Sequence, residues 1–100
     1  MDRSTVVETR TRKTGSVEYL EATITGDADL SPATVQLAIV APGAAASWLT
    51  SAWVGDPTTT GTARTSAAVT YATGRYVVQA KLDASPETPI VDCYYLHVSP

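Results

Sequence analysis

The last quarter of the chain constrains its fold more than any other stretch. Two apolar runs, residues 74–82 and 90–98, are separated by residues 83–89, which contain two prolines. In the first run apolar and polar side chains alternate with a period of two, and the apolar set is Tyr76, Val78, Ala80 and Leu82. That period is typical of a half-buried strand. The pattern therefore predicts an antiparallel hairpin at the end of the chain.

Shorter strand-like runs precede this hairpin, and turn-forming residues separate them, as in a β-sandwich. The predicted strands before the hairpin are residues 5–12, 16–25, 34–41, a short strand at Trp53, and 62–71. These runs predict one all-β domain over residues 1–100, an antiparallel β-sandwich of about seven strands. Residues 1–14 would then form an extended N-terminal arm or an edge strand.

Residues 43–56 allow two predictions. The spacing of Trp48, Leu49, Ala52 and Trp53 suits a short amphipathic helix. An irregular loop that carries Trp48 and leads into a strand at Trp53 agrees better with the β-like segments on both sides, and we favour it.

The predicted core is built from the inward side chains of these strands. Ala and Val dominate the apolar residues and Phe is absent, so the core buries little area for each residue. Oligomerisation would supplement such a core. The residues expected to face one another between the sheets are Leu20, Ile24, Val35, Leu37, Ile39, Tyr76, Val78, Ala80 and Leu82.

The net charge and the cysteine content limit the kinds of partner and the cell compartment that we expect. The net charge of -3 argues against nucleic acid, because phosphate binding needs clustered Lys and Arg. One cysteine permits no intramolecular disulfide, and no run approaches the ~20 apolar residues of a membrane span. We therefore expect no membrane partner and synthesis and folding in a cytoplasm. Arg10 and Arg12 would share one face of a strand and form a solvated edge that resists strand addition.

Candidate catalytic and metal-binding residues are few. His97 is the only histidine, whereas metal sites need several ligands and a catalytic triad needs a partnered base. Cys93 has no evident cationic neighbour that would lower its pKa, so we expect it to pack as a small apolar residue. Asp27 and Asp29 lack the further acidic ligands of a calcium loop. We expect no catalytic residue, no metal and no cofactor.

Large aromatic side chains remain as candidate anchors for a partner, because Trp and Tyr are enriched in interface hot spots. Trp48 lies among Ala, Ser and Thr, a setting that favours exposure, whereas Trp53 could equally occupy the centre of the core. Tyr95 lies on the last strand. The predicted partner-binding residues are Arg10, Arg12, Trp48, Trp53 and Tyr95.

Several short motifs occur in an order that carries a resemblance. They are Glu18-Tyr19-Leu20, Asp29-Leu30-Ser31, Ala33-Thr34-Val35, Pro42-Gly43, Trp48-x4-Trp53, Gly74-x-Tyr76-x-Val78 and Pro86-Glu87-x-Pro89-Ile90. With them, residues 15–98 resemble the small immunoglobulin-like β-sandwich proteins from the head and head-to-tail gene modules of tailed phages of actinobacteria. The depletion of residues with AT-rich codons fits such hosts. A more distant similarity is to the N-terminal sandwich of phage baseplate proteins.

The resemblance implies a non-enzymatic structural protein of the virion. It would be a minor capsid, decoration or head-to-tail connector protein, present in multiple copies or as a homo-oligomer, that binds the major capsid protein or a neck protein. The alternative is a module that binds carbohydrate or the host surface, associated with the tail or baseplate, with the Trp and Tyr rings as stacking platforms.

The expected virion contacts lie in residues 1–13 and 44–53. Trp48 would be the anchor, and Arg10 or Arg12 would pair with acidic groups of the partner. If the interface lies elsewhere, we expect it on the outer face of the closing hairpin, around Tyr95.

Overall fold

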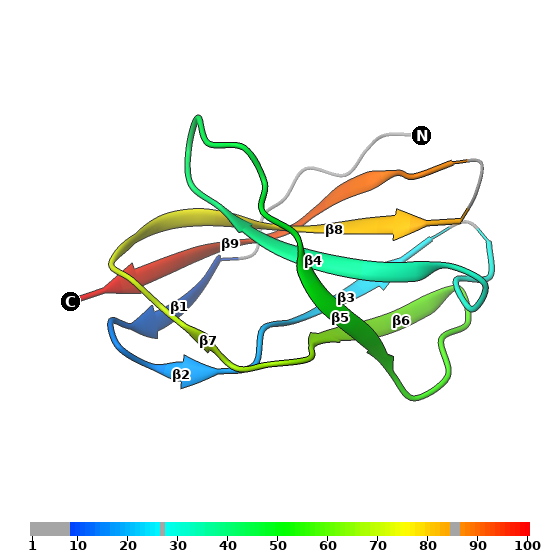
Figure 1. Cartoon of the computed structure of the whole chain (residues 1–100), viewed down its shortest axis with the longest axis horizontal. Coiled ribbons are helices and arrows are strands. Elements are labelled where there is room, and N and C mark those ends of the chain that lie inside the picture. The colour runs from blue at the N-terminus through cyan, green and yellow to red at the C-terminus, as the bar shows by residue number, and fades with distance from the viewer. Residues whose placement is uncertain (1–8, 27, 85–86) are drawn as a thin grey trace.

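The structure is a computed structural model that describes residues 9–26, 28–84 and 87–100. These residues form nine strands and no helix, so none of them belongs to a helix that could cross a membrane. Figure 1 shows the strands as an elongated, curled arrangement. The strands are β1 (Thr9–Lys13), β2 (Val17–Glu18), β3 (Glu21–Thr25), β4 (Thr34–Val40), β5 (Leu49–Val54), β6 (Thr60–Thr65), β7 (Val69–Thr70), β8 (Gly74–Asp83) and β9 (Ile90–Ser99).

Seven strands form one curled sheet in the order β1-β9-β8-β4-β5-β6-β3, and β2 pairs with β7 separately. The sheet curls into two layers because β5 changes partner along its length. Leu49 and Thr50 pair with β4, whereas residues 51–54 pair with β6. Every pairing within the sheet is antiparallel except that of β1 with β9, which is parallel. The predicted all-β sandwich class is confirmed.

The predicted core is found between the layers. Seven of the nine expected residues are buried, and the other two, Ile39 and Tyr76, are half-buried and pack against the same cluster. The predicted core did not include residues of the last strand, which contributes Tyr94, Leu96 and Val98 to it.

The predicted closing hairpin is β8 and β9, with one irregularity. Tyr94 pairs with Val78, but the next pair is Asp92 with Gln79, so Cys93 is the extra residue of a β-bulge. Strict alternation from Tyr94 would place Asp92 on the core side. The bulge turns the Asp92 carboxylate to the outside, where it accepts a hydrogen bond from Gln79 Nε2 at 2.8 Å.

Two predicted strands are each divided in the structure, which raises the strand count from about seven to nine. Residues 16–25 form β2 and β3, and residues 62–71 form β6 and β7. Both breaks occur beside Thr65. Its hydroxyl accepts a hydrogen bond from Leu20 N at 3.1 Å and donates one to Ala67 O at 2.8 Å. These bonds replace the regular ladder at that point.

Residues 43–56 contain a loop and then strand β5, as favoured, and the helical alternative is wrong. Tyr76 lies near the start of the penultimate strand, and its hydroxyl donates a hydrogen bond to Ala72 O at 2.9 Å. A tyrosine bonded to the backbone just upstream is a corner feature of immunoglobulin-like sandwiches. The ring also leaves no room for a side chain at Gly74, where a Cβ would lie 2.9 Å from Tyr76 Oη.

Candidate functional site

The side of β9, β8 and β4 that turns away from the core carries a row of apolar side chains across the sheet. Tyr95 pairs with Val77, and Val77 pairs with Val40. Tyr95 is 47% exposed, whereas Val77 is half-buried and Val40 is buried. Together with the outward residues Arg75, His97 and Ile90, this row defines the β8–β9 outer face.

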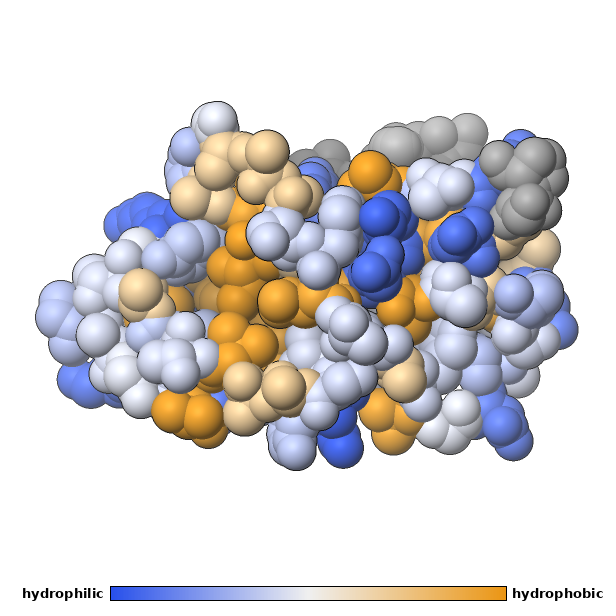
Figure 2. Space-filling model, viewed as in Figure 1, coloured by the Kyte–Doolittle hydropathy of each residue, from blue (hydrophilic) through white to orange (hydrophobic). Residues whose placement is uncertain are grey.

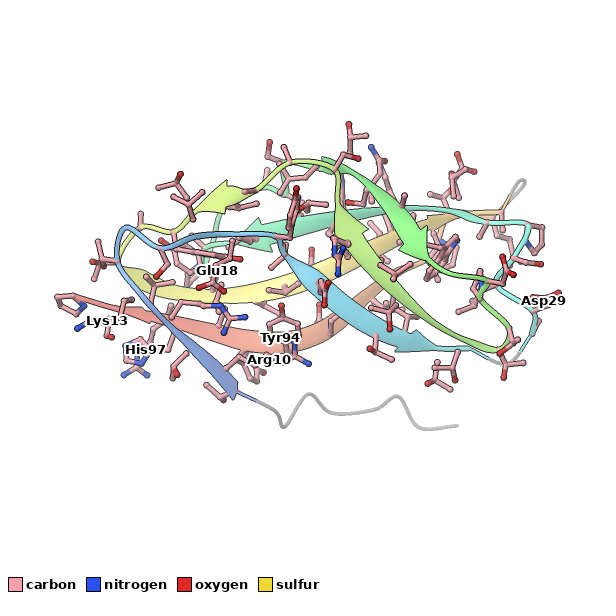
Figure 3. The ribbon with its side chains drawn as sticks, turned by 90° about the horizontal axis from the view of Figure 1, so that it is seen from below. Arg10, Lys13, Glu18, Asp29, Tyr94 and His97 are labelled. Carbon is pink, nitrogen blue, oxygen red and sulfur yellow. The ribbon has the colours of Figure 1, made fainter. Side chains whose placement is uncertain are left out.

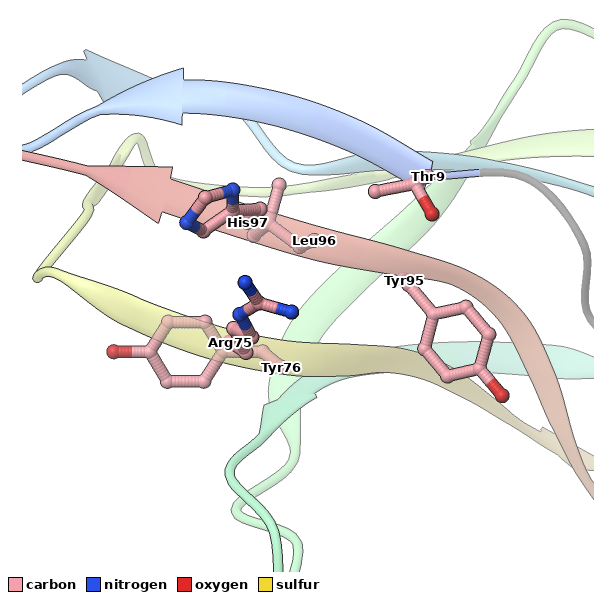
Figure 4. A pocket seen from close by; sticks show the side chains of 6 residues that line it. All are labelled: Thr9, Arg75, Tyr76, Tyr95, Leu96 and His97. Carbon is pink, nitrogen blue, oxygen red and sulfur yellow. The ribbon is translucent and has the colours of Figure 1, made fainter.

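Two hollows adjoin Tyr95 on this face. One measures about 190 Å³ and is lined by Val40, Pro42, Arg75, Tyr76, Val77 and Tyr95. The other measures about 210 Å³ and is lined by Thr9, Arg75, Tyr76, Tyr95, Leu96 and His97 (Figure 4). Arg75 and Tyr95 contribute to both, so a guanidinium group and a half-exposed phenol ring flank two adjacent depressions. We call them the Arg75–Tyr95 hollows.

The charge of this region is positive and locally unbalanced. Arg75 pairs with His97 across β8 and β9, and Thr11 continues the row on β1. Within residues 9–26, 28–84 and 87–100, the exposed Arg75 side chain makes no hydrogen bond or ion pair. Asp92 belongs to another row, with its carboxylate bonded to Gln79. An acidic group of a partner could therefore pair with Arg75 without displacing an internal partner.

Trp48 lies on the same side of the sheet as Tyr95. The register that pairs Leu37 with Leu49 places Trp48 beside Ala38, an outward residue that is nevertheless fully buried. Lys81 Nζ lies 5.0 Å from the centre of the indole ring, within cation–π range. Trp48 is thus half-buried and held against the sheet, and the structure brings two predicted partner-binding residues onto one face.

Trp53 is placed differently, in a packing role. Its indole Nε1 donates a hydrogen bond to Ala33 O at 2.9 Å, and the half-buried ring packs against the core. The ring also rests on Gly61, where an added Cβ would lie 2.8 Å from Trp53 Cζ3. This geometry agrees with the prediction that Trp53 packs in the core, and its role in partner binding stays a prediction.

Arg10 and Arg12 share one face of β1, as expected, but that face is turned inward rather than to solvent. The guanidinium of Arg10 lies 4.1 Å from the centre of the Tyr94 ring. Arg12 Nε is buried and lies 3.1 Å from a carboxylate oxygen of Glu18, an ionic contact without the alignment of a hydrogen bond. Inward charges on an edge strand are a known protection against strand addition. Predicted contacts in residues 1–8 fall outside the described residues.

Figure 3 shows the seam, the side of the molecule on which β1 and β3, the two end strands of the sheet, do not pair with each other. Tyr94 crosses it, because its hydroxyl donates a hydrogen bond to Glu21 O at 2.8 Å. Burial raises the pKa of Tyr94 to about 12, although Arg10 partly offsets the effect. The phenol is therefore neutral at physiological pH and serves as a hydrogen-bond donor that joins the two layers.

The residues considered for chemistry are Cys93, His97, Asp27 and Asp29. Burial, reinforced by Asp92, raises the pKa of Cys93 to about 11, so its thiol stays protonated at neutral pH. No group of three or more His, Cys, Asp or Glu that could hold a metal occurs among the described residues. Asp27 lies outside them, and Asp29 instead accepts hydrogen bonds from Ser31 N and Oγ, both at 3.0 Å.

A third hollow lies on the opposite layer and was not expected from the sequence. It measures about 370 Å³ and is lined by Tyr19, Ala52, Trp53, Val54, Arg64, Thr65 and Ser66. Arg64 forms an ion pair with Glu21, and its guanidinium lies 5.5 Å from the centre of the Tyr19 ring. Tyr19 falls in the break between β2 and β3, so no periodicity marked it, and the Glu21–Arg64 pairing joins residues far apart in the chain.

A fourth hollow, of about 320 Å³, occurs where β5 leaves one layer for the other. Figure 2 shows apolar side chains reaching the surface on this side of the molecule. The lining contains no charged residue: Leu49, Thr50, Thr65, Ser66, Ala67, Ala68 and Val69. A partner could fit this hollow by its shape, but the lining has no charged group that would orient the partner.

No protein-family model matches the chain, and a search of curated proteins finds no match. Function is therefore inferred from the chemistry of these surfaces and from the motifs of residues 15–98.

Proposed function

We propose that the chain is a non-enzymatic structural protein of a tailed-phage virion that docks through its β8–β9 outer face. The observation that supports this most is the half-exposed Tyr95 between two hollows, next to Arg75, which has no partner in the described part of the chain. Tyr and Arg are among the residues most enriched in interface hot spots. Both project from paired strands, so little backbone entropy is lost when a partner binds.

The resemblance of residues 15–98 supports the place of the protein in the particle. It favours a minor capsid, decoration or head-to-tail connector protein, made in the host cytoplasm and then incorporated into the virion in multiple copies. The partner would be the major capsid protein or a neck protein. At the contact it would present an apolar side chain to the Arg75–Tyr95 hollows and a carboxylate to Arg75.

Quantitative mass spectrometry of purified particles tests this proposal. We expect the chain to co-purify with intact particles through a density gradient, at a fixed ratio of several copies or more to the portal ring. A Tyr95→Asp variant should fold but be lost from particles, because the carboxylate places a charge in an apolar contact. A chain that is abundant in the lysate but absent from washed particles would contradict a structural role.

The third hollow favours carbohydrate binding as a second candidate function. Sugar sites combine an aromatic ring with planar polar groups, and here Tyr19 lies beside the Arg64–Glu21 ion pair. Trp53 lines the same hollow, so its fluorescence would report binding. Titration with soluble oligosaccharides to about 1 mM should change that emission, and Tyr19→Ala should abolish the change. Emission that stays constant for every sugar would exclude binding of this strength.

A further inference from the structure

The β8–β9 outer face carries different groups at its two ends. At one end are Arg75, His97 and the half-exposed Tyr95. At the other end Ile90 is 54% exposed, and Glu87 and Asp92 on either side of it are exposed as well. We call residues 87–92 the acidic segment.

The two ends cannot meet within one chain. Ile90 pairs with Lys81, which follows Arg75 by six residues on β8. At roughly 3.3 Å per residue, about 20 Å separates Ile90 from Arg75, and about 13 Å separates Arg75 from Asp92, which pairs with Gln79. Any contact between them must therefore join different molecules.

The acidic segment has the chemistry that the Arg75–Tyr95 hollows lack. The smaller hollow, about 190 Å³, is lined mostly by apolar and aromatic residues: Val40, Pro42, Tyr76, Val77 and Tyr95. A cavity of roughly 150 Å³ accommodates benzene, so this volume suffices for an isoleucine side chain. Glu87 and Asp92 would bring carboxylates to the Arg75 guanidinium, which has no partner among the described residues, and would form a charge-assisted pair with it.

We propose that a second copy of this chain docks its acidic segment on the Arg75–Tyr95 hollows, with Ile90 in the apolar hollow and a carboxylate on Arg75. The contact joins two different surfaces, so it is heterologous and repeats head to tail. Such contacts generate a ring when the rotation from one copy to the next brings the last copy back to the first, and an open filament when it does not. The inference goes beyond the virion role and does not depend on it. A second copy and a capsid or neck protein cannot occupy the same hollows, so only a copy whose hollows are free, at the end of an open row, could also make the virion contact.

Sedimentation velocity of the purified full chain over a wide concentration range is the first measurement. We expect species larger than a monomer that increase with concentration and decrease when salt is raised, because the paired charges are at the surface. Arg75→Gln should raise the dissociation constant about tenfold or more. Arg64→Gln is the matched control on the opposite layer and should leave it within about twofold.

A mixing experiment tests the heterologous geometry. Arg75→Asp removes the acceptor surface and Ile90→Asp removes the docking surface, so each variant alone should remain monomeric. When mixed, the intact acidic segment of the first variant meets the intact hollows of the second. One native contact forms, the remaining surfaces both carry Asp and repel, and assembly should stop at a 1:1 dimer. Circular dichroism of each variant confirms that these exposed substitutions leave the fold intact.

Monomers at every concentration would overturn the proposal, as would variants that still oligomerise or a mixture that stays monomeric. If the chain is monomeric alone yet enters virions at high copy number, self-docking is wrong while the virion role stands. If it forms head-to-tail oligomers but is absent from particles, self-docking stands and the virion role is wrong.

Discussion

The two outer faces of this sandwich differ in whether their polar side chains have partners within the chain. On the β3–β6 outer face, outward residues pair with one another across the strands: Arg64 with Glu21, Thr23 with Thr62 at 3.1 Å, and Thr25 with Thr60 at 3.2 Å. On the β8–β9 outer face, Arg75 has no such partner among the described residues, and Tyr95 stands half-exposed between two hollows.

The contrast indicates which face gains from a partner. A cross-strand ion pair or hydroxyl pair must be broken or desolvated when a second protein covers it, so little free energy remains for binding. A lone guanidinium beside apolar hollows exchanges water for a carboxylate and buries an aromatic ring as well. We infer that binding is concentrated on the β8–β9 outer face, although both faces belong to one curled sheet.

The largest effect on stability is expected from a residue in the core between the two layers. Leu37 is fully buried and pairs with Ala80 and Leu49, where β4 joins β8 and β5. Leu37→Ala should lower the free energy of unfolding by about 2 to 5 kcal/mol, measured by urea denaturation. Val17→Ala is the exposed control and should change it by less than about 0.5 kcal/mol. A loss below about 1 kcal/mol for Leu37→Ala would mean that the layers do not share this core.

An alkaline titration tests the link between the layers. The folded pKa of Tyr94 is about 12, and an unfolded chain releases this proton near pH 10. Above pH 10 the unfolded state therefore binds fewer protons, and stability falls as pH rises towards 12, by about 2 kcal/mol for this group. Tyr94→Phe should cost about 1 kcal/mol at neutral pH through the lost bond to Glu21 O, yet show a shallower alkaline fall.

If the stability of Tyr94→Phe fell with rising pH as steeply as that of the wild type, Tyr94 would not be the cause of the alkaline loss of stability. Tyr71 and Cys93, whose pKa values are also raised by burial, would then dominate the alkaline behaviour.

The fold class followed from local alternation, because β4 and β8 each show a period of two that needs no tertiary information. Features set by pairing between distant strands were not visible. The bulge at Cys93, which turns Asp92 outward, depends on how β9 aligns with β8. The breaks beside Thr65 depend on Leu20, which is 45 residues away in the sequence.

The candidate surface was predictable in part for the same reason. Tyr95 and Trp48 were expected because large aromatic residues are rare in this chain, and the structure places both on one side of the sheet. The row that joins Arg75 to His97 arises only from the register of the hairpin. The inward direction of Arg10 and Arg12 arises from the parallel pairing of β1 with β9, which no local pattern indicates.

The smallest expected effect is the coupling free energy between charged side chains on each of the two faces. A double-mutant cycle on Arg64 and Glu21, each changed to Gln, should give a coupling of about 0.2 to 1 kcal/mol, as for exposed ion pairs. The same cycle on Arg75 and Asp92, which make no contact, should give a coupling near zero. A coupling for Arg75 equal to that of Arg64 would show that its charge is already used within the chain.

The most direct test compares the two half-exposed tyrosines, one on each layer. Tyr95→Ser and Tyr19→Ser remove rings of similar exposure, 47% and 51%, and both variants should remain folded. Copy number per particle, measured by quantitative mass spectrometry after complementation of a deletion, is the readout. We predict that Tyr95→Ser falls at least about tenfold while Tyr19→Ser stays at the wild-type level. Equal copy numbers, or a loss only for Tyr19→Ser, would contradict the claim that the β8–β9 outer face binds the particle.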